Sequence, residues 1–161
     1  MFLLPCLSQP LPASVKLTVV IDTDCGIDDM RAISLLLAAK DINISAILLS
    51  DGSLPPGEGY EKIRQLLHRF GKDSIPIGKG KADLKIDPPW REFNELITWG
   101  NFPEIRNDFP EKGANEEFTE IANHTADGFT MICLGSLTNL AEAIKSDTVL
   151  TRKIERVIWY N

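Results

Sequence analysis

Residues 16–37 read KLTVVIDTDCGIDDMRAISLLL, and this stretch joins a short apolar run to an amphipathic one. The first part, Lys16–Asp22, is rich in β-branched residues and is short enough for a buried strand. From Met30 to Leu37 the apolar residues recur at helical spacing, and Gly26 between the two parts suits a tight turn. The stretch therefore predicts a strand, a turn and a helix, the unit from which α/β sheets are built.

Four aspartates lie within this short stretch, at Asp22, Asp24, Asp28 and Asp29. Like charges at such spacing repel one another, so they are typical of sites where a cation, a set of bound hydroxyl groups or a proton transfer offsets the repulsion. In an open α/β sheet, ligands bind beyond the carboxyl ends of the strands. Asp22 and Asp24 alternate by two and are expected on one side of the strand end, with Asp28 and Asp29 at the start of the helix. We expect all four to converge on a functional site.

Three alternative roles fit the four aspartates to different degrees. A single Asp at this place is often only a helix N-cap, but capping does not account for four. An EF-hand loop starting at Asp22 would need a bidentate Glu at its twelfth position, where this chain has Ile33. A phosphatase of the haloacid dehalogenase kind would use Asp22 as nucleophile and Asp24 as acid/base, although Gly26 stands where Thr or Val is expected. This phosphatase interpretation stays open as an alternative.

Strand and helix patterns alternate through most of the chain. The predicted strands are 16–22, 44–49, 75–77, 129–134 and 154–160, and the predicted helices are 28–40, 59–70, 116–124 and 137–145. Such alternation predicts an open, mostly parallel α/β sheet of the Rossmann-like kind, with helices on both faces and right-handed crossovers. Residues 16–161 are expected to form one domain, preceded by an N-terminal extension, residues 1–15, that is a possible remnant of a signal peptide.

The segment 78–114 breaks the alternation, because it mixes prolines with aromatic residues. A long loop in a compact domain is often a lid or a binding element. Its aromatic residues can stack on a nucleobase or pack the loop against the sheet, and packing is the commoner role. A short helix is expected over residues 91–99.

The composition is that of an ordinary globular domain. Hydrophobic residues make up 43% and charged residues 25% of the 161 residues, and the net charge is −6. An acidic chain is a poor partner for nucleic acid, and the sequence has no apolar run of the roughly 18 residues that a membrane helix needs. Three cysteines, far apart, predict neither a zinc site nor a disulfide framework. We expect a cytoplasmic protein that binds a small molecule, and a homo-oligomer stays possible.

Two motifs together resemble a known family. Residues 22–29, DTDCGIDD, followed by Ala32 and Ile33, resemble the D-T-D-P-G-x-D-D-x-x-A-I signature of the inosine/uridine-preferring nucleoside hydrolases. Residues 134–141, LGSLTNLA, look like the G-P-L-T-N-x-A segment of the same family, again after an apolar strand. Two motifs in the right order are more specific than either alone, and the resemblance spans residues 16–161.

The resemblance implies a calcium-dependent hydrolase that cleaves the N-glycosidic bond of ribonucleosides. By this likeness Asp24 is a Ca²⁺ ligand and the general base, and Asp29 is a second Ca²⁺ ligand. Asp22 is a supporting carboxylate around the same metal ion, and Leu134 gives its backbone carbonyl to the metal. Asp28 receives the ribose hydroxyls. Such a cation suits the reaction because it can bind the ribose hydroxyls and lower the pKa of a bound water, while the nearby carboxylates stabilise the positive charge that builds on the ribose as the bond breaks.

The family is built on longer chains, so this chain is expected to correspond to the N-terminal half of such a unit. The resemblance places further ligands and the leaving-group residues in the second half. A truncated, non-catalytic homologue that binds calcium or a sugar is therefore the second alternative.

Overall fold

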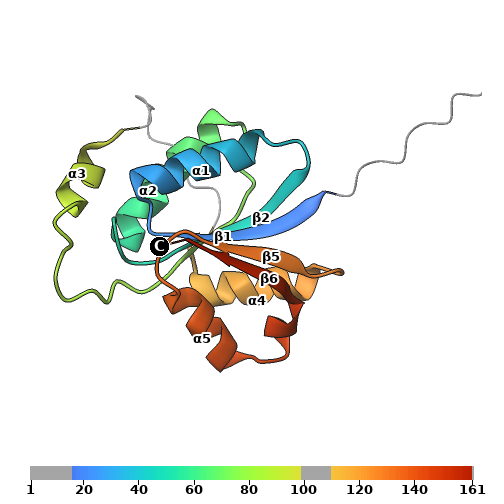
Figure 1. Ribbon diagram of the computed structural model, residues 1–161. Helices are drawn as coiled ribbons and strands as arrows, with labels where there is room; N and C mark the ends of the chain where they lie inside the picture. Colours follow the sequence, from blue (N-terminus) through green and yellow to red (C-terminus); the bar gives the residue numbers. More distant parts are fainter. Residues whose placement is uncertain (1–15, 99–109, 161) are drawn as a thin grey trace, which may run out of the picture.

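The computed structural model describes residues 16–98 and 110–160, which form a parallel β-sheet covered by helices on both faces (Figure 1). The strands are β1 (Leu17–Thr23), β2 (Ile42–Leu49), β3 (Ile77–Lys79), β4 (Lys112–Gly113), β5 (Phe129–Cys133) and β6 (Ile154–Trp159). Every strand pair is parallel, as the alternating pattern predicts. The expectations for residues 1–15, for Trp99 and for the aromatic residues between 102 and 109 lie outside the described residues.

The strand order across the sheet is β4-β3-β2-β1-β5-β6, so β1 lies in the middle. The chain first builds the sheet outward from β1 through β2 and β3 to β4, and then returns to add β5 and β6 on the other side of β1. The order therefore reverses next to β1. In open α/β sheets this reversal leaves a crevice at the carboxyl ends of the strands, because the connections leave in opposite directions.

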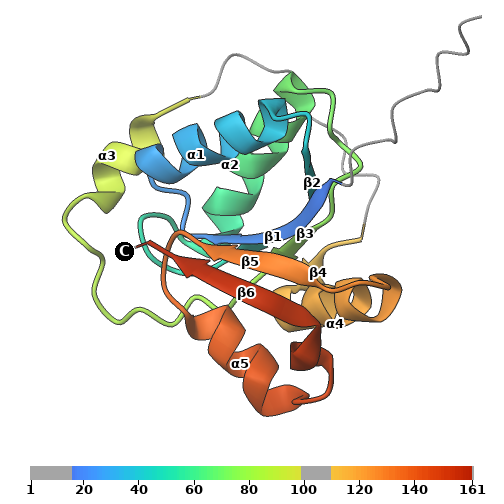
Figure 2. The same cartoon turned by 45° about the vertical axis from the view of Figure 1, so that its right-hand side comes forward.

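The two faces of the sheet pack against different helices. The helices are α1 (Ile27–Ala38), α2 (Pro56–Arg69), α3 (Arg91–Leu96), α4 (Ala114–His124) and α5 (Thr138–Ser146), with a 3-10 turn η1 at Leu150–Lys153. Helices α1 and α2 cover one face, and α4 and α5 cover the other (Figures 1 and 2). Along β1 the neighbours Val20 and Ile21 point into opposite cores, as alternation in a strand requires.

Each core is formed by apolar side chains that are almost fully buried. Ile21, Ile47 and Ile63 belong to the core under α1 and α2. Val20 and Phe118 belong to the core under α4 and α5, where Phe118 also contacts Phe129 edge to face with ring centroids 5.9 Å apart. Burial on both faces explains why the strands read as nearly continuous apolar runs rather than as alternating ones.

The structure corrects three details of the predicted elements. The third strand begins at Ile77 rather than at residue 75, since Pro76 has no N–H for a ladder and contributes only its carbonyl, which accepts from the Ile47 N–H. The segment 78–114 contains β4, which the sequence did not predict, because two residues carry no periodicity. Helix α3 ends at Leu96, so the expected helix from residue 91 exists but is shorter.

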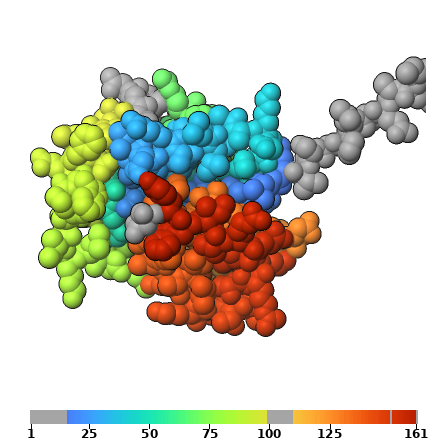
Figure 3. Space-filling model, viewed as in Figure 1, coloured from blue at the N-terminus to red at the C-terminus, as the bar shows by residue number. Residues whose placement is uncertain are grey.

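The last strand differs from the prediction in its burial. The apolar residues of 154–160 are typical of a buried strand, but the side chains of β6 from Glu155 to Trp159 are exposed. β6 pairs with β5 alone among the described residues, and it forms part of the surface in Figure 3. Its apolar residues Val157 and Ile158 are partly open to solvent, at 45% and 46% relative exposure, because β6 has a strand neighbour on one side only among the described residues. In the part of the chain that the structure describes, no helix is long and apolar enough to cross a membrane.

Candidate active site

Three segments meet at the carboxyl ends of the central strands, beside the point where the strand order reverses. They are the β1–α1 turn, the loop that follows β2 and the turn that follows β5. The backbone joins them directly: the Leu134 N–H donates to the Asp22 carbonyl at 2.7 Å, and the Leu54 N–H donates to the Asp24 carbonyl at 2.9 Å. The aspartate cluster therefore lies at the switch point of the sheet, the place where open α/β sheets bind their ligands.

Asp22 is fully buried at the end of β1. Its Oδ1 accepts a hydrogen bond from Asn139 Nδ2 at 3.0 Å, but its Oδ2 has no hydrogen-bond partner among the described residues. Burial raises the pKa of Asp22 to about 7, because an ionised carboxylate is poorly solvated there. The nearby Ser50 hydroxyl lowers this pKa but makes no hydrogen bond of normal geometry within the described part of the chain, so Asp22 Oδ2 is suited to a ligand that supplies positive charge.

Asp29 lies in the first turn of α1 and is also buried. The hydroxyl of Thr23, the last residue of β1, donates to Asp29 Oδ2 at 2.6 Å. Burial raises the pKa of Asp29, and the nearby charges of Asp24 and Asp28 raise it further. The end of β1 thus holds the carboxylate of α1 directly, through a hydrogen bond.

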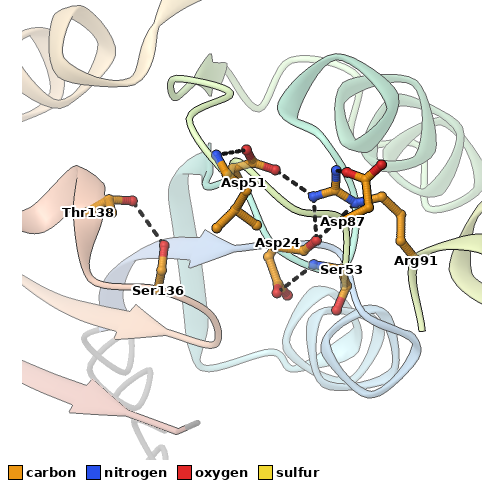
Figure 4. A network of polar contacts seen from close by, with 9 residues as sticks. Asp24, Asp51, Ser53, Asp87, Arg91, Ser136 and Thr138 are labelled. Carbon is orange, nitrogen blue, oxygen red and sulfur yellow. Dashed lines mark hydrogen bonds and ion pairs between the residues drawn. The ribbon is translucent and has the colours of Figure 1, made fainter. Parts of the chain in front are cut away.

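Asp24 is half-buried in the turn between β1 and α1. Its Oδ2 accepts a hydrogen bond from the Ser53 N–H at 2.8 Å (Figure 4). Gly52 packs so closely on this carboxylate that an added Cβ would lie 2.1 Å from Asp24 Oδ2, and a Cβ on Gly135 would lie 3.0 Å from the Asp24 amide nitrogen. Backbone from the β2 and β5 loops therefore encloses Asp24 on two sides.

Cys25 has a left-handed backbone conformation, with φ of 62°. This φ is strained for a residue with a side chain and is impossible for proline, whose ring fixes φ near −65°. The Cys25 N–H donates to Thr23 Oγ1 at 2.9 Å, which helps to hold the turn. Burial raises the pKa of the Cys25 thiol far above its usual range, so this residue is a structural element of the turn and not a nucleophile.

The structure brings most of the predicted residues together but gives them different surroundings. Strand β1 ends at Thr23, so Asp24 lies outside the strand. Asp22 and Asp24 therefore have different surroundings, whereas strand alternation predicted that they would lie on one side of the strand end. Asp28 is exposed. Leu134 begins the turn after β5. Within the described ranges, no three Asp, Glu, His or Cys side chains lie in an arrangement that could hold a metal ion.

The carboxylates nevertheless fit a hard cation in their chemistry. The donors at the strand end are oxygens only, which suits Ca²⁺ or Mg²⁺ rather than a softer metal. Asp22 Oδ2 is without a hydrogen-bond partner among the described residues, and burial raises the pKa of both Asp22 and Asp29, so a positive charge bound here would stabilise their ionised forms. Asp22, Asp24 and Asp29 are the side chains that would hold such an ion.

Three residues of the site, Asn139, Arg91 and Asp51, were not singled out as site residues from the sequence. Asn139 is buried at the start of α5 and donates to both Asp22 and the Leu49 carbonyl, each at 3.0 Å. It lies within the LTN motif, so the motif was the signal that could have found it. Arg91 and Asp51 form a buried ion pair of 2.7 Å that connects α3 to the loop after β2. No spacing rule links two residues that lie 40 positions apart.

Helix α3 lies on the side of the sheet where the strands end (Figure 2). It is held there by polar contacts with two helices. Asn94 Oδ1 accepts from the Ile27 N–H at 3.2 Å, at the first turn of α1, and Lys62 of α2 donates to the carbonyls of Glu95 and Ile97. Polar contacts therefore anchor α3 beside the switch point, and the expected aromatic packing is not seen for the two aromatic residues of this segment that the structure describes. Trp90 and Phe93 are more than half exposed, at 56% and 59%.

The parallel α/β sheet, with acidic residues at its switch point, defines an open α/β domain with a candidate hydrolase site. The chain matches the family described as inosine-uridine preferring nucleoside hydrolase over residues 19–160. Because the match covers most of the chain, the protein belongs to this family, as the two sequence motifs predicted.

Relatives and solved structures agree with this family. The chain is 26% identical to "Probable uridine nucleosidase 2" of Oryza sativa subsp. japonica over 146 residues, covering 87% of this chain and 43% of the relative. It is 28% identical to "Pyrimidine-specific ribonucleoside hydrolase RihA" of Citrobacter koseri, covering 89% and 47%. The solved "Plant nucleoside hydrolase - PpNRh1 enzyme" matches with a TM-score of 0.74 at 26% identity, covering 89% and 47%. The chain thus spans about half the length of the relatives it matches.

Proposed function

We propose that this chain carries the carboxylate half of a nucleoside hydrolase site and takes part in calcium-dependent cleavage of the N-glycosidic bond of ribonucleosides. The observation that supports this most directly is the buried Asp22 with its unpartnered Oδ2, set beside Asp24 and Asp29 at the switch point. Membership of the nucleoside hydrolase family makes ribonucleosides the substrate class to test.

The roles we propose follow from the surroundings of each residue. Asp24 is half-buried, keeps one oxygen on the Ser53 amide and is the general base that takes a proton from water. Asp22 and Asp29 are held by Asn139 and Thr23 and complete the oxygen ligands of this part of the site. Asp28 is exposed at the same helix end and is the residue that accepts hydrogen bonds from ribose hydroxyls.

A bound Ca²⁺ would supply a hard positive charge that attracts hydroxyl oxygens and makes water a better acid. The carboxylates themselves also favour the reaction. The ribose ring gains positive charge as the bond to the base breaks, and nearby negative charge stabilises such a transition state. Leu134 is proposed to add its backbone carbonyl, a role that any side chain permits.

The test is release of free base from inosine and uridine, followed with purified protein at millimolar calcium and again after chelation. Hydrolysis that stops on chelation and returns with calcium supports the proposal. If Asp24→Asn retains full activity, the base is another residue. Calcium binding without any hydrolysis would favour the alternative of a non-catalytic calcium-binding or sugar-binding homologue. Magnesium-dependent release of phosphate from a phosphomonoester would favour the phosphatase alternative instead.

A further inference from the structure

Arg91, at the start of α3, is buried although it carries a permanent charge. Its Nη2 donates to Asp51 Oδ1 and to the Gly52 carbonyl, each at 2.7 Å, and its Nε reaches the same carbonyl at 3.3 Å. Its Nη1 donates to Asp87, whose side chain is largely exposed. The planar guanidinium group suits such a fork of acceptors and gives a fixed geometry that a lysine does not.

The Gly52 carbonyl and the Ser53 N–H belong to one peptide unit. The carbonyl accepts from Arg91, and the N–H donates to Asp24 Oδ2 at 2.8 Å (Figure 4). A trans peptide is planar, and its C=O and N–H point in opposite directions. Fixing the carbonyl therefore also fixes the direction of the N–H. A cation at the oxygen end also polarises the peptide and strengthens its N–H as a donor.

The loop has little freedom to rearrange around this peptide. Gly52 approaches Asp24 so closely that no side chain fits, and the second oxygen of Asp51 accepts from the Leu84 N–H at 2.9 Å. Asp51 is therefore held from both sides, by the arginine and by the backbone of the segment before α3. The loop is fixed at both Asp51 and Gly52, directly beside the carboxylate.

We propose that Arg91 is a positioning residue for Asp24. Arg91 acts through the Gly52–Ser53 peptide, whose N–H holds one carboxylate oxygen of Asp24 so that the other oxygen is presented to the site at the strand ends. Part of this inference rests on the proposed function, since the catalytic consequence requires Asp24 to be the base. The connection itself does not require it. If Arg91 only anchored α3, its loss would free α3 and leave the Ser53–Asp24 contact unchanged.

The direct test is nuclear magnetic resonance of the metal-free chain, which reads the contact without any activity. In Arg91→Gln we expect faster exchange of the Ser53 amide hydrogen, on the order of tenfold, because its hydrogen bond has weakened. The ¹³C shift of the Asp24 carboxyl group should change as well. Arg91→Lys keeps the charge but not the fork, so its shifts should lie between those of Arg91→Gln and the wild type.

Two further variants keep the test decisive. Arg152→Gln removes an exposed arginine in η1, away from the site, and should leave both signals unchanged. Arg91→Gln leaves Asp51 as a buried charge without its partner, which can unfold the chain. The double variant Asp51→Asn with Arg91→Gln removes both charges, and we expect the same loss at Ser53. Unchanged Ser53 exchange and an unchanged Asp24 shift in a folded Arg91 variant would overturn the proposal.

Activity provides a second readout that separates this inference from the proposed function. If the chain hydrolyses nucleosides, Arg91→Gln should lower kcat by up to about 10²-fold with little change in KM, since misplacement of a reacting group affects the chemical step. An unchanged kcat would contradict a positioning role. If the wild-type chain is inactive, the proposed function fails, while the nuclear magnetic resonance result still decides the role of Arg91.

Discussion

Asn139 of α5 donates a hydrogen bond of 3.0 Å to Asp22 of β1, across 117 positions of the sequence. The two residues come from the two motifs that marked the chain, and the parallel pairing of β1 with β5 brings them together. Asn139 also donates to the carbonyl at the end of β2. One amide group therefore ties β2 and the β1 carboxylate to α5, the helix that follows β5.

We expect Asn139→Ala to destabilise the chain by about 1–3 kcal/mol, because it removes the hydrogen-bond donor from a buried carboxylate and a buried carbonyl. Chemical denaturation measured at neutral pH checks this. The matched control is Asn43→Ala, an exposed residue of β2, which should change stability by less than about 0.5 kcal/mol. Equal effects of the two substitutions would contradict the role given to Asn139.

Gly52→Ala should disrupt the site, since its Cβ would lie 2.1 Å from Asp24 Oδ2. The loop must shift, at a cost of about 1–3 kcal/mol for overpacking, and the Ser53–Asp24 hydrogen bond should be lost. Thermal unfolding together with the Ser53 amide shift measures both effects. Gly57 in α2 has open space around it, so Gly57→Ala should be neutral or stabilising by up to about 1 kcal/mol. A Gly52→Ala variant as stable as wild type, with the amide unchanged, would count against the packing described.

Calcium should raise the melting temperature by mass action on the folded state. The dissociation constant of calcium from the folded chain is expected on the order of 10⁻⁴ to 10⁻³ M, as for calcium sites with few ligands. Calcium at ten times Kd stabilises by about 1.4 kcal/mol, which corresponds to roughly 3–6 °C for a chain of this size. Differential scanning calorimetry with and without calcium measures the shift.

The variants Asp24→Asn and Asp29→Asn should each abolish this gain, and in the metal-free state each should be as stable as the wild type or slightly more so, because a repelling charge is gone. Asp41→Asn is the control, since Asp41 is exposed at the opposite end of the sheet, before β2. It should leave the response to calcium intact. A calorimetric titration without binding at millimolar calcium, in folded protein, would remove the metal site.

The metal-free chain should lose stability as the pH rises from about 4 to about 7. The pKa of Asp22 is 3.8 in its ordinary state and is raised by burial to about 7 in the fold, so the folded state binds the proton more tightly. The stabilisation that the protonated Asp22 gives to the folded state is fully present below pH 3.8 and is lost as the pH rises through about 7. Urea denaturation in the presence of a chelator gives the profile. Asp22→Asn should make it flatter, and an unchanged slope would show that Asp22 is not its source.

The amino-acid sequence alone was enough to predict the α/β class, the strand-turn-helix unit around the aspartates and the family. These depend on local patterns: β-branched runs, helical spacing, a turn glycine and two motifs whose residues are close together in the chain. Parallel pairing also followed, because strands that alternate with helices can only be joined by crossovers. The aspartates could be identified as a cluster because all four lie within eight consecutive residues.

The differences among the carboxylates arise from the folded arrangement of distant segments. Asp22 is buried and lacks a partner for one oxygen, Asp24 is enclosed by backbone from two loops, and Asp28 faces solvent, although all three are equivalent in the pattern. Arg91 could not be assigned to the site from the sequence, because its partner Asp51 lies 40 positions earlier and its contact with Gly52 is to a backbone atom. Hydrogen bonds to backbone groups leave no trace in side-chain periodicity, and burial depends on what the rest of the chain places nearby.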